Sequence, residues 1–127
     1  MIVNEPSVLA EVTAAFAAYE AALMANDTQA LDALFWASPH VLRYGASENL
    51  YGQDEIAAFR QARPGGAPQR RLTHRVITTF GSDFATANTE FLQIGTGRVG
   101  RQSHTWVRLP EGWRIVAAHV SMLGDGP

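Results

Sequence analysis

Hydrophobic positions along the chain follow a helical period in its first part and a strand period in its second part. Within residues 5–25, apolar and aromatic side chains recur every three or four positions, which places them on one side of a helix. This stripe consists of Val8, Val12, Phe16, Tyr19 and Leu23. Asn26 and Asp27 end this helix and can cap a second helix over residues 28–34, so we predict a helical hairpin.

A short strand and a third helix are predicted between residues 36 and 63. Residues 40–44 favour a strand with Arg43 in its middle. Residues 45–52 favour a loop, and residues 53–62 favour a helix. The side of this helix that we expect to be buried carries Ile56, Phe59 and Ala62. An arginine inside a strand faces either water or a cavity that receives an anion, so the orientation of Arg43 bears directly on function.

From Pro68 onward the hydrophobic period is two, which is typical of strands. We expect four of them, over residues 70–80, 83–94, 98–109 and 113–122. Short turns join them, so the sheet should be antiparallel. Helices followed by long antiparallel strands are typical of an α+β domain whose N-terminal helices pack on one face of a curved sheet. We expect a pocket between that face of the sheet and the helices.

The composition favours a single globular domain over residues 1–127. Hydrophobic residues make up 46% and charged residues 17%, and no apolar run approaches the roughly 20 residues of a membrane helix. The N-terminal region carries acidic residues and an early proline instead of the features of a secretory signal, so we expect a cytoplasmic protein without a membrane partner. A net charge of -2 without a basic block argues against nucleic acid.

The residue types present exclude several kinds of chemistry. The chain has no cysteine, so disulfides, thiolate nucleophiles and cysteine-ligated metals are excluded. All 10 basic side chains are arginine, which excludes a lysine Schiff base and leaves anion recognition to guanidinium groups, although a GC-rich genome would produce the same bias. The histidines show no paired ligand spacing, so we expect neither metal nor cofactor. The G-x-G-x-x-G motif at residues 95–100 precedes a strand, and we interpret it as a hairpin turn.

Tyr19 and Arg43 are the first candidates for a site. Tyr19 lies on the apolar stripe, so its buried hydroxyl needs a partner or a cavity, unless it is simply a core tyrosine. Arg43 alternates with its neighbours and shares a face with Val41. If that face is internal, the guanidinium needs an anionic ligand or an acidic neighbour such as Glu48 or Glu20; otherwise it is a solvated strand arginine.

Polar positions on the last two strands are further candidates. Gln102 and His104 share a face with Trp106 and suit a wet pocket, although a bulge at Gly97 or Gly100 could exchange this face with the opposite one. On the last strand, His119 and Ser121 share the face of its apolar residues and should line the inner wall. The alternative is a satisfied core histidine beside a small packing residue.

Three residues are expected to flank the mouth of the pocket as substrate-binding groups: Asn49, Tyr51 and Arg63. The alternative is that they are ordinary loop and helix-end residues, which is the more frequent situation for an arginine such as Arg63.

The closing stretch GWRIVAAHVS, at residues 112–121, resembles the nuclear-transport-factor-2-like (NTF2-like, cystatin-like or SnoaL-like) cone. Three other stretches are similar to the AtzH-like family, which includes the HpxZ proteins of oxalurate catabolism. They are RYGASENLYG at 43–52, FRQARP at 59–64 and GRVGRQSHTWVR at 97–108. The resemblance implies a homodimer and a metal-independent amidohydrolase acting on a small anionic substrate, either a carboxylated urea such as 1,3-dicarboxyurea or an oxalurate-type amide.

In that family the catalytic roles fall on a helix-1 tyrosine and on the arginine of the R-Y-G motif, and the matching positions are Tyr19 and Arg43. A guanidinium beside a phenol stabilises the phenolate and can also hold a carboxylate or an oxyanion. Two alternatives stay open: an isomerase or dehydratase of the same fold, and a noncatalytic module that binds a small anion.

Overall fold

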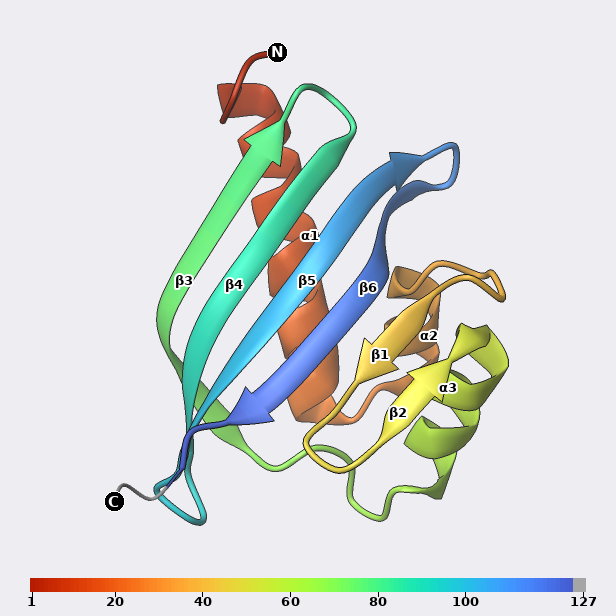
Figure 1. Cartoon of the computed structure of the whole chain (residues 1–127), viewed down its shortest axis with the longest axis vertical. Coiled ribbons are helices and arrows are strands. Elements are labelled where there is room, and N and C mark those ends of the chain that lie inside the picture. Colours follow the sequence, from red (N-terminus) through yellow and green to blue (C-terminus); the bar gives the residue numbers. More distant parts are fainter. Residues whose placement is uncertain (125–127) are drawn as a thin grey trace.

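The computed structural model describes residues 1–124, which form three helices and six strands (Figure 1). In chain order the elements are α1 (Pro6–Ala25), α2 (Thr28–Leu34), β1 (Leu42–Tyr44), β2 (Asn49–Tyr51), α3 (Gly52–Ala62), β3 (Arg70–Phe80), β4 (Phe84–Gln93), β5 (Val99–Leu109) and β6 (Gly112–Met122). The helical hairpin, the third helix and the four long strands are confirmed. Asn26 closes α1 in the left-handed conformation, and the Asp27 side chain caps α2 by accepting from the Ala30 amide.

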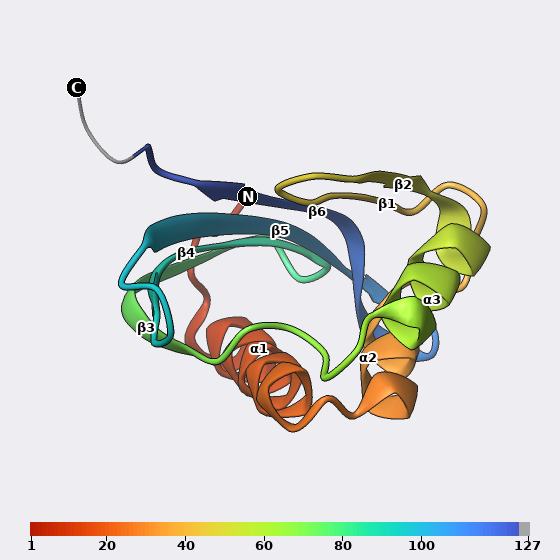
Figure 2. The same cartoon turned by 90° about the horizontal axis from the view of Figure 1, so that it is seen from below.

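The strands form one six-stranded sheet in the order β2-β1-β6-β5-β4-β3. Neighbours are antiparallel except β1 and β6, which run parallel. The sheet curves over α1, and α2 and α3 close the side next to β1 and β2 (Figure 2). This is the α+β cone, with N-terminal helices on a curved sheet, that the sequence predicts.

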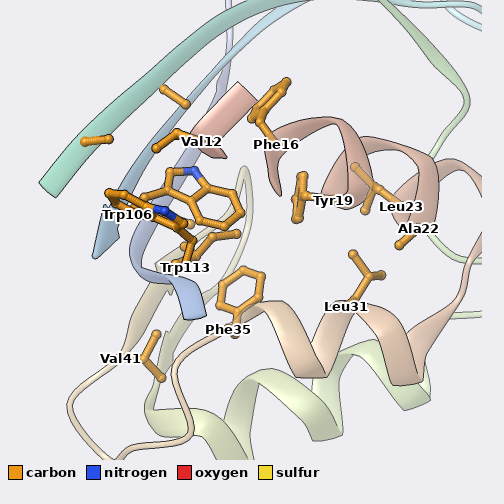
Figure 3. Packing of buried hydrophobic residues seen from close by; sticks show 14 of the residues in the cluster. Val12, Phe16, Tyr19, Ala22, Leu23, Leu31, Phe35, Val41, Trp106 and Trp113 are labelled. Atoms are coloured by element: carbon orange, nitrogen blue, oxygen red, sulfur yellow. The ribbon is translucent and has the colours of Figure 1, made fainter. Parts of the chain in front are cut away.

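The core lies between the concave face of the sheet and α1. All five members of the α1 stripe are buried, with Val12 fully inaccessible. Tyr19 projects from α1 toward Phe35, with the ring centroids 6.3 Å apart, and Trp106 belongs to the same cluster (Figure 3). By length and hydropathy α1 alone among the described residues would suit a membrane span, contrary to the sequence expectation, but its apolar stripe is occupied by packing against the sheet.

A β-bulge in β6 changes which of its residues face the core. Trp106 of β5 pairs with Ile115, whereas the preceding Thr105 pairs with Ala117, so β6 has one extra residue at this point. A one-residue insertion reverses the alternation of faces along the rest of a strand. Beyond the bulge Ala118 is therefore buried and His119 is exposed.

The segment between α2 and β3 differs from the sequence expectation in two respects. Residues 45–52 are not a plain loop, because β2 pairs with β1 there. On α3 the buried face carries Ile56 and Arg60, while Ala62 is exposed. Arg60 is buried because Asp32 forms an ion pair with it and its guanidinium lies 5.0 Å from the centroid of the Phe35 ring.

Candidate functional site

An open cavity of about 320 Å³ lies at one end of the cone, where α1, α3 and the loop before β2 meet the concave face of the sheet. Pockets of this order hold small ligands. Its described lining includes four arginines, Arg43, Arg63, Arg70 and Arg98, and one carboxylate, Glu48. Tyr19, Phe59, Phe91 and Gln102 also contribute. The chemistry of the wall is therefore that of an anion site with aromatic support.

Arg43 enters the cavity from β1. Its neighbours in the sheet are Leu50 of β2 and Ala118 of β6, and its side chain shares their inward face. Nη1 donates to Oε1 of Glu48 at 2.8 Å, and the guanidinium lies 5.5 Å from the centroid of the Phe59 ring. Arg43 thus faces a cavity and has the acidic neighbour that the sequence suggested.

Arg63, just after α3, brings a second guanidinium to the same ring, 5.2 Å from the Phe59 centroid. Its Nε is buried and has no hydrogen-bond partner among the described residues. Burial lowers the pKa of Arg63, and the charges of Arg43 and Arg60 lower it further, whereas Tyr19 acts in the opposite direction. Mutually repelling cations with an unsatisfied N–H favour a bound anion.

Arg70 forms the opposite wall from β3. Its Nε and Nη2 donate to the two carboxylate oxygens of Glu20 on α1, at 3.0 and 2.6 Å. Nη2 also donates to Oε1 of Gln102 at 3.1 Å, and the guanidinium stacks 4.5 Å from the Phe91 centroid. Glu20 therefore partners Arg70 rather than Arg43. The Gln102 amide nitrogen has no partner among residues 1–124, so a donor is left beside the cavity.

Tyr19 marks the inner limit of the cavity. It is 3% exposed, yet it lines the cavity wall. Its ring meets His104 edge-on, with the centroids 4.6 Å apart and the planes at 90°. His104 lies behind Tyr19 and does not contribute to the lining. Burial lowers the pKa of His104 to about 3, assisted by the charges of Arg70 and Arg43, so its imidazole is neutral at physiological pH.

The structure brings four of the nine predicted site residues to one cavity: Tyr19, Arg43, Arg63 and Gln102. The assignment of Gln102, His104 and Trp106 to the concave face was correct, since all three are buried. For His104, however, the expected contact with a pocket was wrong, because Tyr19 separates it from the cavity.

Four predicted site residues lie elsewhere. His119 and Ser121 were expected on the inner wall, but the bulge in β6 turns them outward, where His119 packs on Tyr44 and Ser121 accepts from Arg101. Asn49 and Tyr51 were expected at the mouth, but both side chains are exposed because only Leu50 of β2 points inward. The Tyr51 hydroxyl instead meets that of Tyr44 at 3.0 Å.

Two wall arginines escaped the sequence analysis. Arg70 is the first residue of β3 and Arg98 lies directly before β5, and at such strand ends an arginine ordinarily faces solvent. The sequence did contain an indication of Arg70. Glu20 follows Tyr19 on α1, and a carboxylate next to the buried stripe needs a cationic partner from the sheet that packs on this helix. Within residues 1–124, no group of three or more histidine, aspartate or glutamate residues is arranged to hold a metal ion.

Comparison with solved structures first shows the fold to which this chain belongs. A nuclear transport factor 2 (NTF2-like) superfamily protein from Salmonella enterica superposes with a TM-score of 0.76 at 24% identity, covering 95% of this chain and 98% of that one. This likeness shows the NTF2-like fold alone. No curated protein matches the sequence.

The family follows from closer relatives. The AtzH-like family profile matches residues 1–126. A protein of unknown function from Pectobacterium atrosepticum is 57% identical, with 96% of this chain and 95% of that chain covered and a TM-score of 0.93. A cystatin-like fold protein from Burkholderia xenovorans is 48% identical over 99% of both chains, with a TM-score of 0.94. The chain belongs to the AtzH-like family.

Proposed function

We propose that this protein is a metal-independent amidohydrolase that acts on a small carboxylated urea or an oxalurate-type amide. One observation carries the proposal: Tyr19 and Arg43 line the same cavity, together with Arg63, Arg70 and Arg98. The same cavity therefore contains the Tyr19 hydroxyl, which can transfer a proton, and guanidinium groups, which can bind carboxylates. The family resemblance assigns the catalytic roles to the same tyrosine and arginine.

In the proposed reaction, the phenolic oxygen of Tyr19 takes a proton from a water molecule as the water oxygen adds to the urea or amide carbonyl. Arg43 stabilises the negative charge that develops on the carbonyl oxygen. The C–N bond then breaks, and the leaving nitrogen recovers the proton from Tyr19. Arg63 and Arg70 hold the substrate carboxylates at the two walls, which keeps the carbonyl between base and oxyanion donor.

Isomerase or dehydratase chemistry has less support from the geometry. Such reactions usually need a carboxylate or histidine base that reaches the substrate. Glu20 is occupied by Arg70, and His104 is shielded by Tyr19 with its pKa lowered to about 3 by burial and the arginine charges. Neither group is therefore available as the base, and Glu48, the carboxylate that does line the cavity, is held by Arg43 and Ser47.

The direct test is to incubate the protein with 1,3-dicarboxyurea and, separately, with oxalurate, and to follow the release of ammonia and the carbon products. We expect turnover by the wild type and almost none by Tyr19→Phe, which keeps the ring packing and removes the hydroxyl. Tyr44→Phe is the matched control, because Tyr44 lies on the outer side of β1 and pairs with Tyr51. Binding without turnover in the wild type would instead identify a noncatalytic anion module.

The homodimer and the cytoplasmic location stay predictions. Apolar side chains on the outer face of the sheet, including Val76 and Phe84, each 46% exposed, offer a surface for self-association. Sedimentation at several protein concentrations will determine the oligomeric state.

A further inference from the structure

Glu48 has more contacts than a simple counterion needs. One carboxylate oxygen accepts from Arg43 Nη1 at 2.8 Å. The other accepts from the hydroxyl and the amide of Ser47, at 2.9 and 3.2 Å. Burial raises the pKa of Glu48, but the hydrogen bonds from Arg43 and Ser47 outweigh it, so the pKa lies below its usual value and the carboxylate is charged at neutral pH.

Gly45 provides the surface on which this carboxylate rests. A β-carbon at position 45 would overlap the carboxyl group of Glu48. The backbone does not require glycine there, because Gly45 is not among the glycines with positive φ. Its amide donates to the Glu48 carbonyl at 2.8 Å, which an alanine would preserve. The absence of a side chain at position 45 therefore serves the position of Glu48.

We infer that Glu48 is a positioning residue for the anion site, and that it fixes the Arg43 guanidinium through a cradle formed by Ser47 and Gly45. The pair uses only Nη1 of Arg43, which leaves the other N–H groups of the guanidinium for a ligand. A bidentate contact with a carboxylate or oxyanion depends on the plane of the guanidinium. Glu48 sets that plane before the ligand arrives.

The inference rests on the proposed function only in that Arg43 contacts the substrate, and it is tested with two independent readouts. The first is kcat with the carboxyurea or oxalurate that the wild type hydrolyses. The second is the Kd of malonate, a small dicarboxylate, measured by calorimetry for the folded wild type and for each folded variant. If the wild type binds malonate but hydrolyses neither substrate, the proposed function fails and the second readout still decides the inference.

Glu48→Ala removes the anchor. We expect kcat to fall at least about tenfold, since misplacing a catalytic group by about an ångström costs up to 10²-fold. Glu48→Gln retains an oxygen that can accept from Arg43, so kcat should be partly rescued. If Glu48 were instead an internal competitor of the substrate, Glu48→Ala would lower KM and leave kcat unchanged, and that result would overturn the inference.

Gly45→Ala is the sharper variant, because it displaces the Glu48 carboxylate without changing the charge of the cavity. In the wild-type background it should lower kcat about tenfold or weaken malonate binding several-fold. In the Glu48→Ala background it should have no further effect, because the new methyl group no longer meets a carboxylate. Gly95→Ala is the control, since Gly95 has ordinary φ and open space around its α-carbon.

A harmless Gly45→Ala, or an effect of equal size in both backgrounds, would show that position 45 acts through the backbone and would overturn the inference. Failure of the wild type both to bind malonate and to turn over substrate would overturn it as well, because there would then be no anion site for Glu48 to organise.

Discussion

The cone interior has two ends that are built from the same elements and differ in how their polar groups are partnered. At the open end, α1 and β5 contribute Tyr19 and Gln102 to the arginine-lined cavity. At the closed end, α1 contributes Val12 and Phe16, and β5 contributes Trp106. At the open end Arg43 and Arg70 pair with carboxylates, and the unpartnered Arg63 Nε and Gln102 amide nitrogen belong to residues that line the cavity. At the closed end the Trp106 indole nitrogen also has no partner among residues 1–124, but Trp106 does not line the cavity.

His104 lies at the boundary between the two ends. Its ring contacts Tyr19 on the cavity side and Phe16 and Trp106 on the closed side. Neither of its nitrogens has a partner among residues 1–124. The difference teaches that, on a concave sheet face, the position of a polar residue along its strand decides whether it meets a ligand or the core.

The largest effect is expected at the closed end. Phe16→Ala should lower the free energy of unfolding by about 3–5 kcal/mol, because it removes a fully buried aromatic ring and leaves a void. Urea denaturation measures the change. The matched control is Phe84→Ala, whose side chain is 46% exposed and whose loss should cost far less. If both variants lowered the free energy of unfolding equally, the closed end would not be packed more tightly than the outer face of the sheet.

At the open end, Arg43→Ala should lower kcat by about 10² to 10³, the usual cost of losing one oxyanion donor, with little change in the free energy of unfolding. Steady-state kinetics and urea denaturation of the same preparation separate the two effects. Arg108→Ala is the control, since Arg108 pairs with Asp83 at the surface. A variant that unfolds readily but retains kcat would assign Arg43 to the core rather than to the site.

The boundary residue should produce a pH effect of intermediate size. Burial and the charges of Arg70 and Arg43 lower the pKa of His104 to about 3, so between that value and its ordinary pKa the unfolded chain binds a proton that the folded chain does not. Stability is therefore lost as the pH falls through this window, by at most about 1.4 kcal/mol per pH unit.

His104→Leu should remove this part of the acid sensitivity, as measured by urea denaturation from pH 7 to pH 4. His74→Asn serves as the control, because His74 is exposed on β3 and its replacement should leave the slope intact. An unchanged slope in His104→Leu would mean that water reaches the imidazole.

The smallest effect is expected on the outer face. His119→Ala removes a ring that packs on Tyr44, outside the cavity, so kcat and KM should stay within about twofold of the wild type. A large loss of kcat would show that the outer face of β6 takes part in the site and would contradict the separation of the two faces.

Periodicity was sufficient to predict the three helices and the four long strands, because the alternation of apolar positions is a local property, but it missed β2, which was expected to be part of a loop. It predicted the buried stripe of α1 and the inward face of β5, and from that stripe it suggested that Tyr19 is buried. It could not place His119, because the bulge in β6 depends on the pairing of Ile115 with Trp106 of another strand. Nor could it predict that Arg60 is buried, since Asp32 and Phe35 approach it only in the folded chain.

The parallel pairing of β1 with β6 also bears on how the chain folds. Arg43 lies opposite Ala118, so the strand that carries it pairs with β6, the last of the described strands in chain order. Contacts between such distant segments carry a high loop-closure cost and form slowly. We expect the capacity to bind malonate to appear with the slowest refolding phase, so that a partly folded chain has a core before it has a site.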